Sequence, residues 1–306
     1  MKLNRSAAAL TAIALMLACE NPDGPSLVAL DDSPMFVELP ASTSARGRTA
    51  AENYTLYSAE FITPGGAHGA GRTIYFNDVG NKQLDADFVP GLSLDGTSDI
   101  SYYVDQKRPS NDLSVAVTTA AIERAMTTWK NVDCSDLGLT RVPSNNSIST
   151  GFVAALVGLG GSTNYVADLV HAGWLPGVFF DAIAPPNGSE YILGVTFTII
   201  FNDEEGNPLD SDNNGKADVA WREIYYNDAF AWQDGAHYDV ETIALHEAGH
   251  GLSQAHFGKA FTSGNSNKVH FAPRAVMNAA YSGIQRKITG TDQGGHCSNW
   301  ASWPNN

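Results

Sequence analysis

The segment from His246 to His256 constrains the fold more than any other, because its eleven residues contain three of the eight histidines in the chain. His246 and His250 are four residues apart. On an α-helix this spacing places both imidazoles on one face, one turn apart, where they reach a single ion. His256 comes six residues later, and a continuous helix would rotate it roughly 240° from His250 and lift it about 9 Å. The helix must therefore break between His250 and His256 for the three rings to meet.

The types of residue in this segment indicate what kind of site it forms. Three protein ligands plus water are typical of a catalytic zinc ion, whereas structural zinc sites usually complete the tetrahedron with Cys. No Cys lies near the three histidines. Glu247 directly follows His246 and is placed to act as a general base beside the open coordination position. The alternative, a chance pattern on a solvated helix face, would leave the clustered imidazoles unexplained.

The segment resembles the motif of the metzincin metalloproteases, His-Glu-x-x-His-x-x-Gly-x-x-His. In that family a later tight turn places a Met beneath the metal. Met277, within Ala275-Val276-Met277-Asn278 and 21 residues after His256, is identified with that position and is not a ligand. The resemblance covers roughly residues 98–306, strongly at the motif and weakly elsewhere. Within it a strand at Tyr102 and a helix ending near Trp129 come in the order of matrixin-like members.

The chain departs from the family motif at two positions. Ser253 stands where the family has the Gly that lets the chain turn, and a left-handed conformation costs Ser about 1–2 kcal/mol. We therefore expect a strained or altered turn before His256. Phe257 follows the third His and matches no metzincin subfamily, so the subfamily stays open.

Hydrophobic periodicity predicts an α+β domain. Apolar residues at spacings of three and four predict a helix over 116–129, while Ser101–Val104, Ile192–Phe201 and Val219–Tyr226 are typical of strands. A second helix is predicted from residue 240, with Asp239 as its N-cap. The resemblance implies a mixed twisted sheet packed on the first helix and on the zinc-binding helix. An irregular C-terminal part would carry the Met-turn.

The N-terminus has the features of an export signal. Lys2 and Arg5 precede a short apolar run, Ala7–Ala18, which is too short for a permanent membrane span. The order before Cys19 resembles a bacterial lipoprotein signal, in which Cys19 is lipidated and anchors the protein to a membrane facing the periplasm or exterior. A plainly cleaved signal and a secreted protein are the alternative.

Beyond this signal peptide at 1–19 we expect three segments. Residues 20–60 are rich in Pro, Ser, Ala and Asp and are typical of a flexible tether or pro-segment. Residues 61–97 have short apolar runs broken by Gly and Asn, which predict a β-rich N-terminal extension. The zinc metalloprotease domain would then occupy residues 98–306.

Charge and cysteine content restrict the class of protein further. A net charge of −15 argues against a nucleic-acid partner, because affinity for phosphates depends on Lys and Arg. With Cys19 assigned to the anchor, Cys134 and Cys297 remain. In an exported protein they are expected to form a disulfide, and two separate buried thiols are the alternative.

Residues 210–218 form a second candidate metal site. Oxygen-bearing side chains occupy the first, third, fifth and ninth positions of this loop, namely Asp210, Asp212, Asn214 and Asp218. Gly215 stands at the sixth position, where calcium loops need a sharp turn. Trp221 replaces the usual Glu at the twelfth position. A Ca²⁺ loop and a solvated acidic turn both stay open.

The resemblance implies a zinc-dependent metalloendopeptidase that hydrolyses peptide bonds of extracellular proteins. In this interpretation Glu247 is the general base for a zinc-activated water. Protein or peptide substrates would lie along an edge strand before the zinc helix, within 222–227. The alternative is a surface binding protein that keeps the fold and has weak or no catalytic activity.

Overall fold

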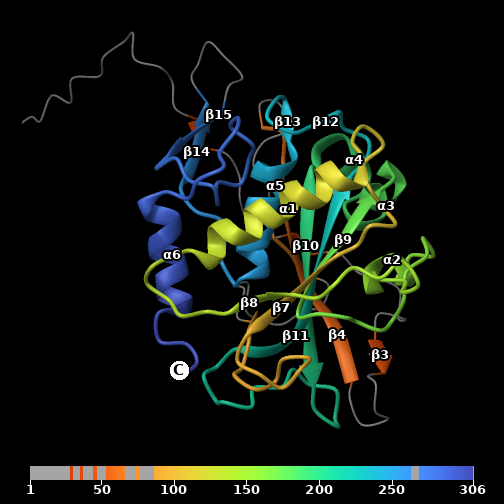
Figure 1. Cartoon of the computed structure of the whole chain (residues 1–306), viewed down its shortest axis with the longest axis vertical. Coiled ribbons are helices and arrows are strands. Elements are labelled where there is room, and N and C mark those ends of the chain that lie inside the picture. Colours follow the sequence, from red (N-terminus) through yellow and green to blue (C-terminus); the bar gives the residue numbers. More distant parts are fainter. Residues whose placement is uncertain are drawn as a thin grey trace, which may run out of the picture.

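The computed structural model describes residues 28–29, 35–36, 44–46, 53–65, 73–75, 86–262 and 269–305. A mixed β-sheet runs through the middle of the molecule (Figure 1). Its strands lie in the order β2 (Met35–Phe36), β5 (Thr73–Tyr75), β4 (Asn53–Ile62), β10 (Gly194–Asn202), β11 (Ala217–Asn227), β9 (Leu169–Leu175), β7 (Ile100–Val104) and β8 (Leu139–Arg141). Two short strands flank this path: β3 (Ser44–Arg46) pairs with β4, and β6 (Ala86–Asp87) pairs with β11.

The central strands are buried on both faces of the sheet. β11 pairs antiparallel with β10 on one side and parallel with β9 on the other. Every residue of β9 and β11 is buried. Such strands carry nearly continuous apolar runs instead of an alternating pattern. The runs expected at 192–201 and 219–226 are therefore strands of this sheet, each shifted at its ends by one or two residues.

Two long helices, α1 (Val115–Lys130) and α5 (Val240–Gly251), pack on one face of the sheet. Ser114 caps α1 and Asp239 caps α5, because their side chains accept hydrogen bonds from the backbone N–H groups of Val117 and Thr242. The two helices cross where the indole N–H of Trp129 donates to the carbonyl oxygen of Leu245 at 2.8 Å. The other face is covered by α2 (Phe152–Leu156) and α3 (Gly177–Ile183), with α4 (Gly188–Tyr191) beside α3.

The C-terminal part is more ordered than the sequence indicated. We expected an irregular segment, yet it contains α6 (Gly290–Trp300). A capping box between Thr289 and Asp292 begins this helix despite its Gly-rich sequence. A disulfide joins Cys297 of α6 to Cys134 after α1. Two small sheets complete the fold: β1 (Val28–Ala29), β14 (Lys259–Thr262) and β15 (Val269–Ala272) form one, and β12 (Trp232–Gln233) and β13 (Tyr238–Asp239) the other.

The sheet begins earlier in the chain than the expected segment boundaries. β4 starts at Asn53, so residues 53–60, which we expected to belong to the tether, lie in the main sheet beside β10. The signal peptide and Cys19 lie outside the described residues. Among the described residues, none of the helices has the length and apolar character needed to cross a membrane.

Candidate metal centre

Three imidazoles converge at the C-terminal end of α5. Nε2 of His250 lies 3.0 Å from Nε2 of His246 and 3.1 Å from Nε2 of His256. Zinc–nitrogen bonds of about 2.0–2.1 Å at a tetrahedral angle would place two such nitrogens roughly 3.3 Å apart. The spacing of the rings therefore fits one ion, and the buried triad is compatible with a metal site.

Backbone carbonyl groups orient two of these rings. Nδ1 of His246 lies 2.7 Å from the carbonyl oxygen of Val276, and Nδ1 of His250 lies 2.7 Å from that of Gln254. A carbonyl only accepts, so each Nδ1 carries the proton and donates it, which leaves Nε2 as the metal-facing lone pair. Burial also lowers the pKa of His246 and His256 well below the ordinary value and that of His250 to about 3. All three rings are thus neutral, as metal ligands must be.

The turn that delivers His256 uses a strained residue. The helix ends at Gly251 with Leu252 as its C-cap, and Ser253 adopts a left-handed conformation with φ of 65°. The buried guanidinium of Arg222, which is 3% exposed, donates to the Ser253 hydroxyl oxygen at 2.8 Å and to the Gly251 carbonyl at 3.1 Å. Arg222 therefore stabilises the turn at Ser253, and the expected strain is present.

α6 supports the same turn from the other side. The side-chain amide of Asn299 donates to the carbonyl oxygen of Ser253 at 3.0 Å, and the indole of Trp300 donates to that of Leu252 at 2.8 Å. These contacts were not predicted from the sequence, because they join residues nearly fifty positions apart. The Thr-x-x-Asp capping pattern at 289–292 was the available signal for α6.

Glu247 directly follows His246 on α5 and has no exposed surface. Its Oε2 accepts a hydrogen bond from the Thr196 hydroxyl of β10 at 2.7 Å. Burial raises the pKa of Glu247 well above its ordinary value, while hydrogen bonds from Thr196 and from the backbone of Ile62 oppose the rise. A carboxyl with a raised pKa is suited to exchanging protons near neutral pH.

Met277 is 1% exposed and packs against α5. A Cβ added to Gly249 of α5 would come within 2.3 Å of the Met277 sulfur, so only Gly allows this contact. Asp292 at the start of α6 accepts hydrogen bonds at 3.1 Å from the backbone N–H groups of Val276 and Met277. The Met-turn is therefore fixed to both α5 and α6.

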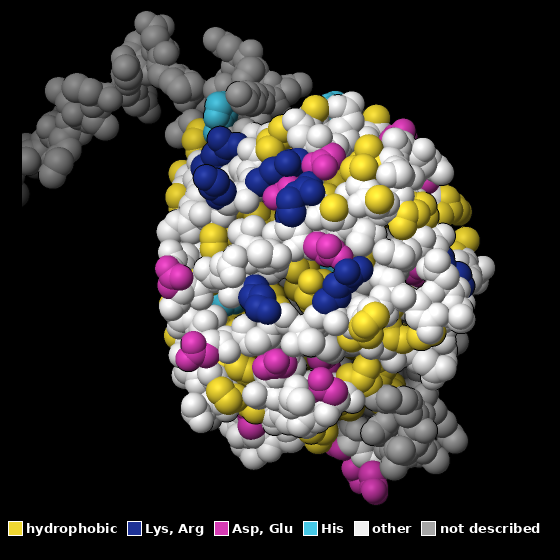
Figure 2. All heavy atoms as spheres, in the orientation of Figure 1, with side chains coloured by type: hydrophobic (Ala, Val, Ile, Leu, Met, Phe, Trp, Pro, Cys, Tyr) yellow, Lys and Arg dark blue, Asp and Glu magenta, His cyan; other side chains and the backbone are white. Residues whose placement is uncertain are grey.

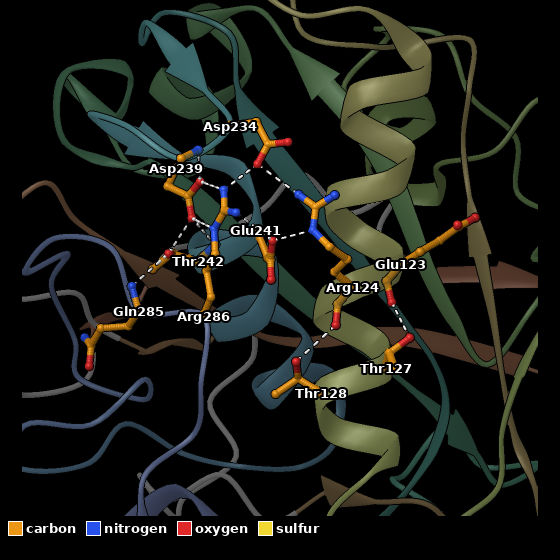
Figure 3. Close-up of polar contacts among 11 residues, drawn as sticks. Glu123, Arg124, Thr127, Thr128, Asp234, Asp239, Glu241, Thr242, Gln285 and Arg286 are labelled. Atoms are coloured by element: carbon orange, nitrogen blue, oxygen red, sulfur yellow. Dashed lines mark hydrogen bonds and ion pairs between the residues drawn. The ribbon is translucent and has the colours of Figure 1, made fainter.

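Charged side chains from three segments fix the beginning of α5 (Figure 3). Arg286 binds Asp239 at 2.5 Å and Glu241 at 3.3 Å, and also contacts Asp234. Arg124 of α1 binds Glu241 at 2.5 Å and Asp234 at 2.9 Å. The network sets the position of α5, and hence of its histidines, relative to α1.

Acidic and basic side chains are interspersed on the face of the molecule that Figure 2 shows.

The substrate strand expected within 222–227 is not at an edge. That stretch belongs to β11, which is paired on both sides by β10 and β9. The strand next to α5 is β10, and its outer side is paired with β4. Just after β4, the backbone is also paired, because the Tyr281 N–H donates to the Thr63 carbonyl oxygen at 2.7 Å. A peptide therefore cannot add to β11.

A cavity of about 380 Å³ opens beside His256, Phe257 and Met277.

The acidic loop brings together the carboxylates of three predicted ligands. Carboxylate oxygens of Asp210, Asp212 and Asp218 lie within 4.8 Å of one another, an arrangement that could hold a metal ion. Asn214, the fourth predicted ligand, donates its side-chain amide to Asp212 at 3.1 Å. Gly215 turns the loop with φ of 86°.

Comparison with protein-family models and with curated proteins found no match to this chain.

Proposed function

We propose that the chain is a zinc-dependent metalloendopeptidase that hydrolyses peptide bonds of extracellular proteins. One observation carries the proposal: the ring nitrogens of three neutral imidazoles meet at one point, and the buried Glu247 directly follows the first of these histidines on α5. The donor set supports zinc, because three nitrogens without thiolates are typical of catalytic zinc sites. The family resemblance of the motif and of Met277 supports a peptide substrate.

The residues of the chain have separate roles in this proposal. His246, His250 and His256 hold the metal, which when bound polarises a carbonyl group and makes water more acidic. Glu247 takes the proton from the attacking water and returns it to the leaving amine. Thr196 orients Glu247 through its 2.7 Å hydrogen bond.

The alternative is a surface binding protein with a non-catalytic metal centre. One observation favours it: Glu247 is fully buried, and the backbone of Ile62 donates a hydrogen bond to it. Hydrolysis requires this part of the chain to separate from Glu247. The two functions therefore differ in whether Glu247 ever meets water and substrate.

The test compares the parent chain with Glu247→Gln, which keeps the size of the side chain and removes the base. We expect both proteins to bind one zinc ion per chain. Only the parent should cleave casein, with loss of activity on chelation and recovery on adding zinc. The variant should lose at least 100-fold in rate, the scale of general-base catalysis. Zinc binding without casein cleavage by the parent would favour the binding protein.

Three further assignments complete the proposal. We propose Ca²⁺ as the ion for Asp210, Asp212 and Asp218, because hard carboxylate oxygens suit it.

The Cys134–Cys297 disulfide supports an exported protein. Lipidation of Cys19 remains a proposal, and mass spectrometry of the membrane-extracted N-terminus would distinguish it from plain cleavage of the signal.

A further inference from the structure

We infer that Glu60 of β4 is a positioning residue of the metal centre, which holds the His250 ring so that Nε2 points at the ion. The inference depends on the proposed function only for the metal ion and not for hydrolysis. Glu60 is 4% exposed, and its carboxylate contacts Nδ1 of His250. The N-terminal strand thus becomes part of the metal centre, although its sequence carries no ligand motif.

Strand register places Glu60 at the site. β4 runs antiparallel to β10, and Glu60 lies directly opposite Thr196. Thr196 in turn donates its hydroxyl to Glu247 at 2.7 Å. One cross-strand pair therefore supplies a carboxylate to a metal-ligating ring and a hydroxyl to the general base. A shift of one residue in the register of β4 would turn Glu60 to the opposite face of the sheet, away from Thr196.

The contact with Glu60 matches what metal-bound imidazoles require. A ligating His usually donates its other ring N–H to a carboxylate or a carbonyl, which fixes the tautomer and makes the ring a better donor to the metal. Nδ1 of His250 donates its proton to the Gln254 carbonyl at 2.7 Å, and the Glu60 carboxylate contacts the same nitrogen. The ring is therefore held from the turn after α5 and from β4.

Charge balance supports the same role. A buried carboxylate is costly unless positive charge lies nearby. Glu60 and the buried Arg222 line one cavity of about 40 Å³ beside His250. Three neutral imidazoles leave the two positive charges of a zinc ion uncompensated, so Glu60 adds to Glu247 in balancing them. A purely structural role would instead make Glu60 only the counter-ion of Arg222.

The experiment measures zinc affinity by competition with a chromophoric chelator, for the full chain and for Glu60→Gln and Glu60→Ala. Loss of such a carboxylate partner typically weakens metal binding 10–100-fold. We expect a loss near tenfold for Glu60→Gln, which keeps an acceptor, and a larger one for Glu60→Ala. The visible spectrum of the cobalt-substituted protein should also change in both variants, because the His250 ring is no longer fixed.

Ser58→Ala is the matched control, because Ser58 is buried on the same face of β4 two residues earlier. It should leave affinity and spectrum unchanged. Unchanged zinc affinity and cobalt spectrum in both Glu60 variants would overturn the inference. The inference would also be overturned if Ser58→Ala lost as much zinc affinity as the Glu60 variants. It would likewise fail if the Glu60 variants lost only stability of the metal-free protein. A parent chain that binds zinc but cleaves no casein would contradict the hydrolase proposal and leave the role of Glu60 standing.

Discussion

At Ser253 the cost of backbone strain is opposed by the energy of a side-chain hydrogen bond. Its φ of 65° costs about 1–2 kcal/mol for a residue with a Cβ. Its hydroxyl accepts a charge-assisted hydrogen bond from the buried Arg222 at 2.8 Å, worth about 1.5–3 kcal/mol. The hydrogen bond offsets the strain, which explains how Ser is tolerated in this turn. The sequence showed the strain but not the compensation, because Arg222 lies on a strand 31 residues earlier.

Replacing Ser253 separates these two terms. Ser253→Ala keeps the strain and loses the hydrogen bond, so the free energy of unfolding should fall by about 1.5–3 kcal/mol. Ser253→Gly loses the same bond but relieves the strain, and after the cost of a more flexible unfolded chain it should be about 1 kcal/mol more stable than the Ala variant. Urea unfolding of the metal-free protein measures both.

The exposed Ser147 provides the control for this comparison, since Ser147→Ala should change stability by less than about 0.5 kcal/mol. Equal destabilisation of the Gly and Ala variants at position 253 would mean that the turn is not strained.

At the scale of secondary structure, the elements with a clear local signal were predictable. The helix expected over 116–129 is α1 with one more residue at each end, and Asp239 caps α5 as expected. β9 was not predicted, because His171 and Gly173 interrupt its apolar run and it has no alternation to detect. α6 was not predicted either, because its Gly-rich sequence depends on a capping box and on tertiary contacts.

The close packing of α5 on the Met-turn gives a test at this scale. In Gly249→Ala the new Cβ would meet the Met277 sulfur at 2.3 Å and the Trp129 ring at 3.1 Å. Overpacking of this kind costs about 1–3 kcal/mol, which outweighs the gain of about 1 kcal/mol in helix propensity. Zinc affinity should fall as well, because Val276, next to Met277, orients His246. Urea unfolding and zinc titration measure the two effects.

Gly294→Ala in α6 is the matched control, since no atom of the described residues lies within 4 Å of the point where its Cβ would stand. It should gain up to about 1 kcal/mol of stability and leave zinc affinity unchanged. If Gly249→Ala also left zinc affinity unchanged and did not lower stability, the close contact between α5 and the Met-turn would contribute to neither property.

At the scale of the whole molecule, the metal centre depends on segments from most of the chain. The three histidines and Glu247 were visible in the sequence, because they lie within eleven residues. Glu60, Arg222, Asp292 and Asn299 were not, since each reaches the site only through strand register or helix packing. A local pattern thus indicates the site, while its supporting contacts require the fold.

The Cys134–Cys297 disulfide ties the end of α1 to α6 across 163 residues, and α6 holds both the Met-turn and the Ser253 turn. In the chain-entropy model, opening a loop of this length lowers the free energy of unfolding by about 5 kcal/mol. Cys134→Ser/Cys297→Ser should therefore unfold at a markedly lower urea concentration and bind zinc more weakly. Each single variant should match the double variant, because either one opens the same loop. Additive losses, or an unchanged urea midpoint, would show that α6 is held in place by its packing alone.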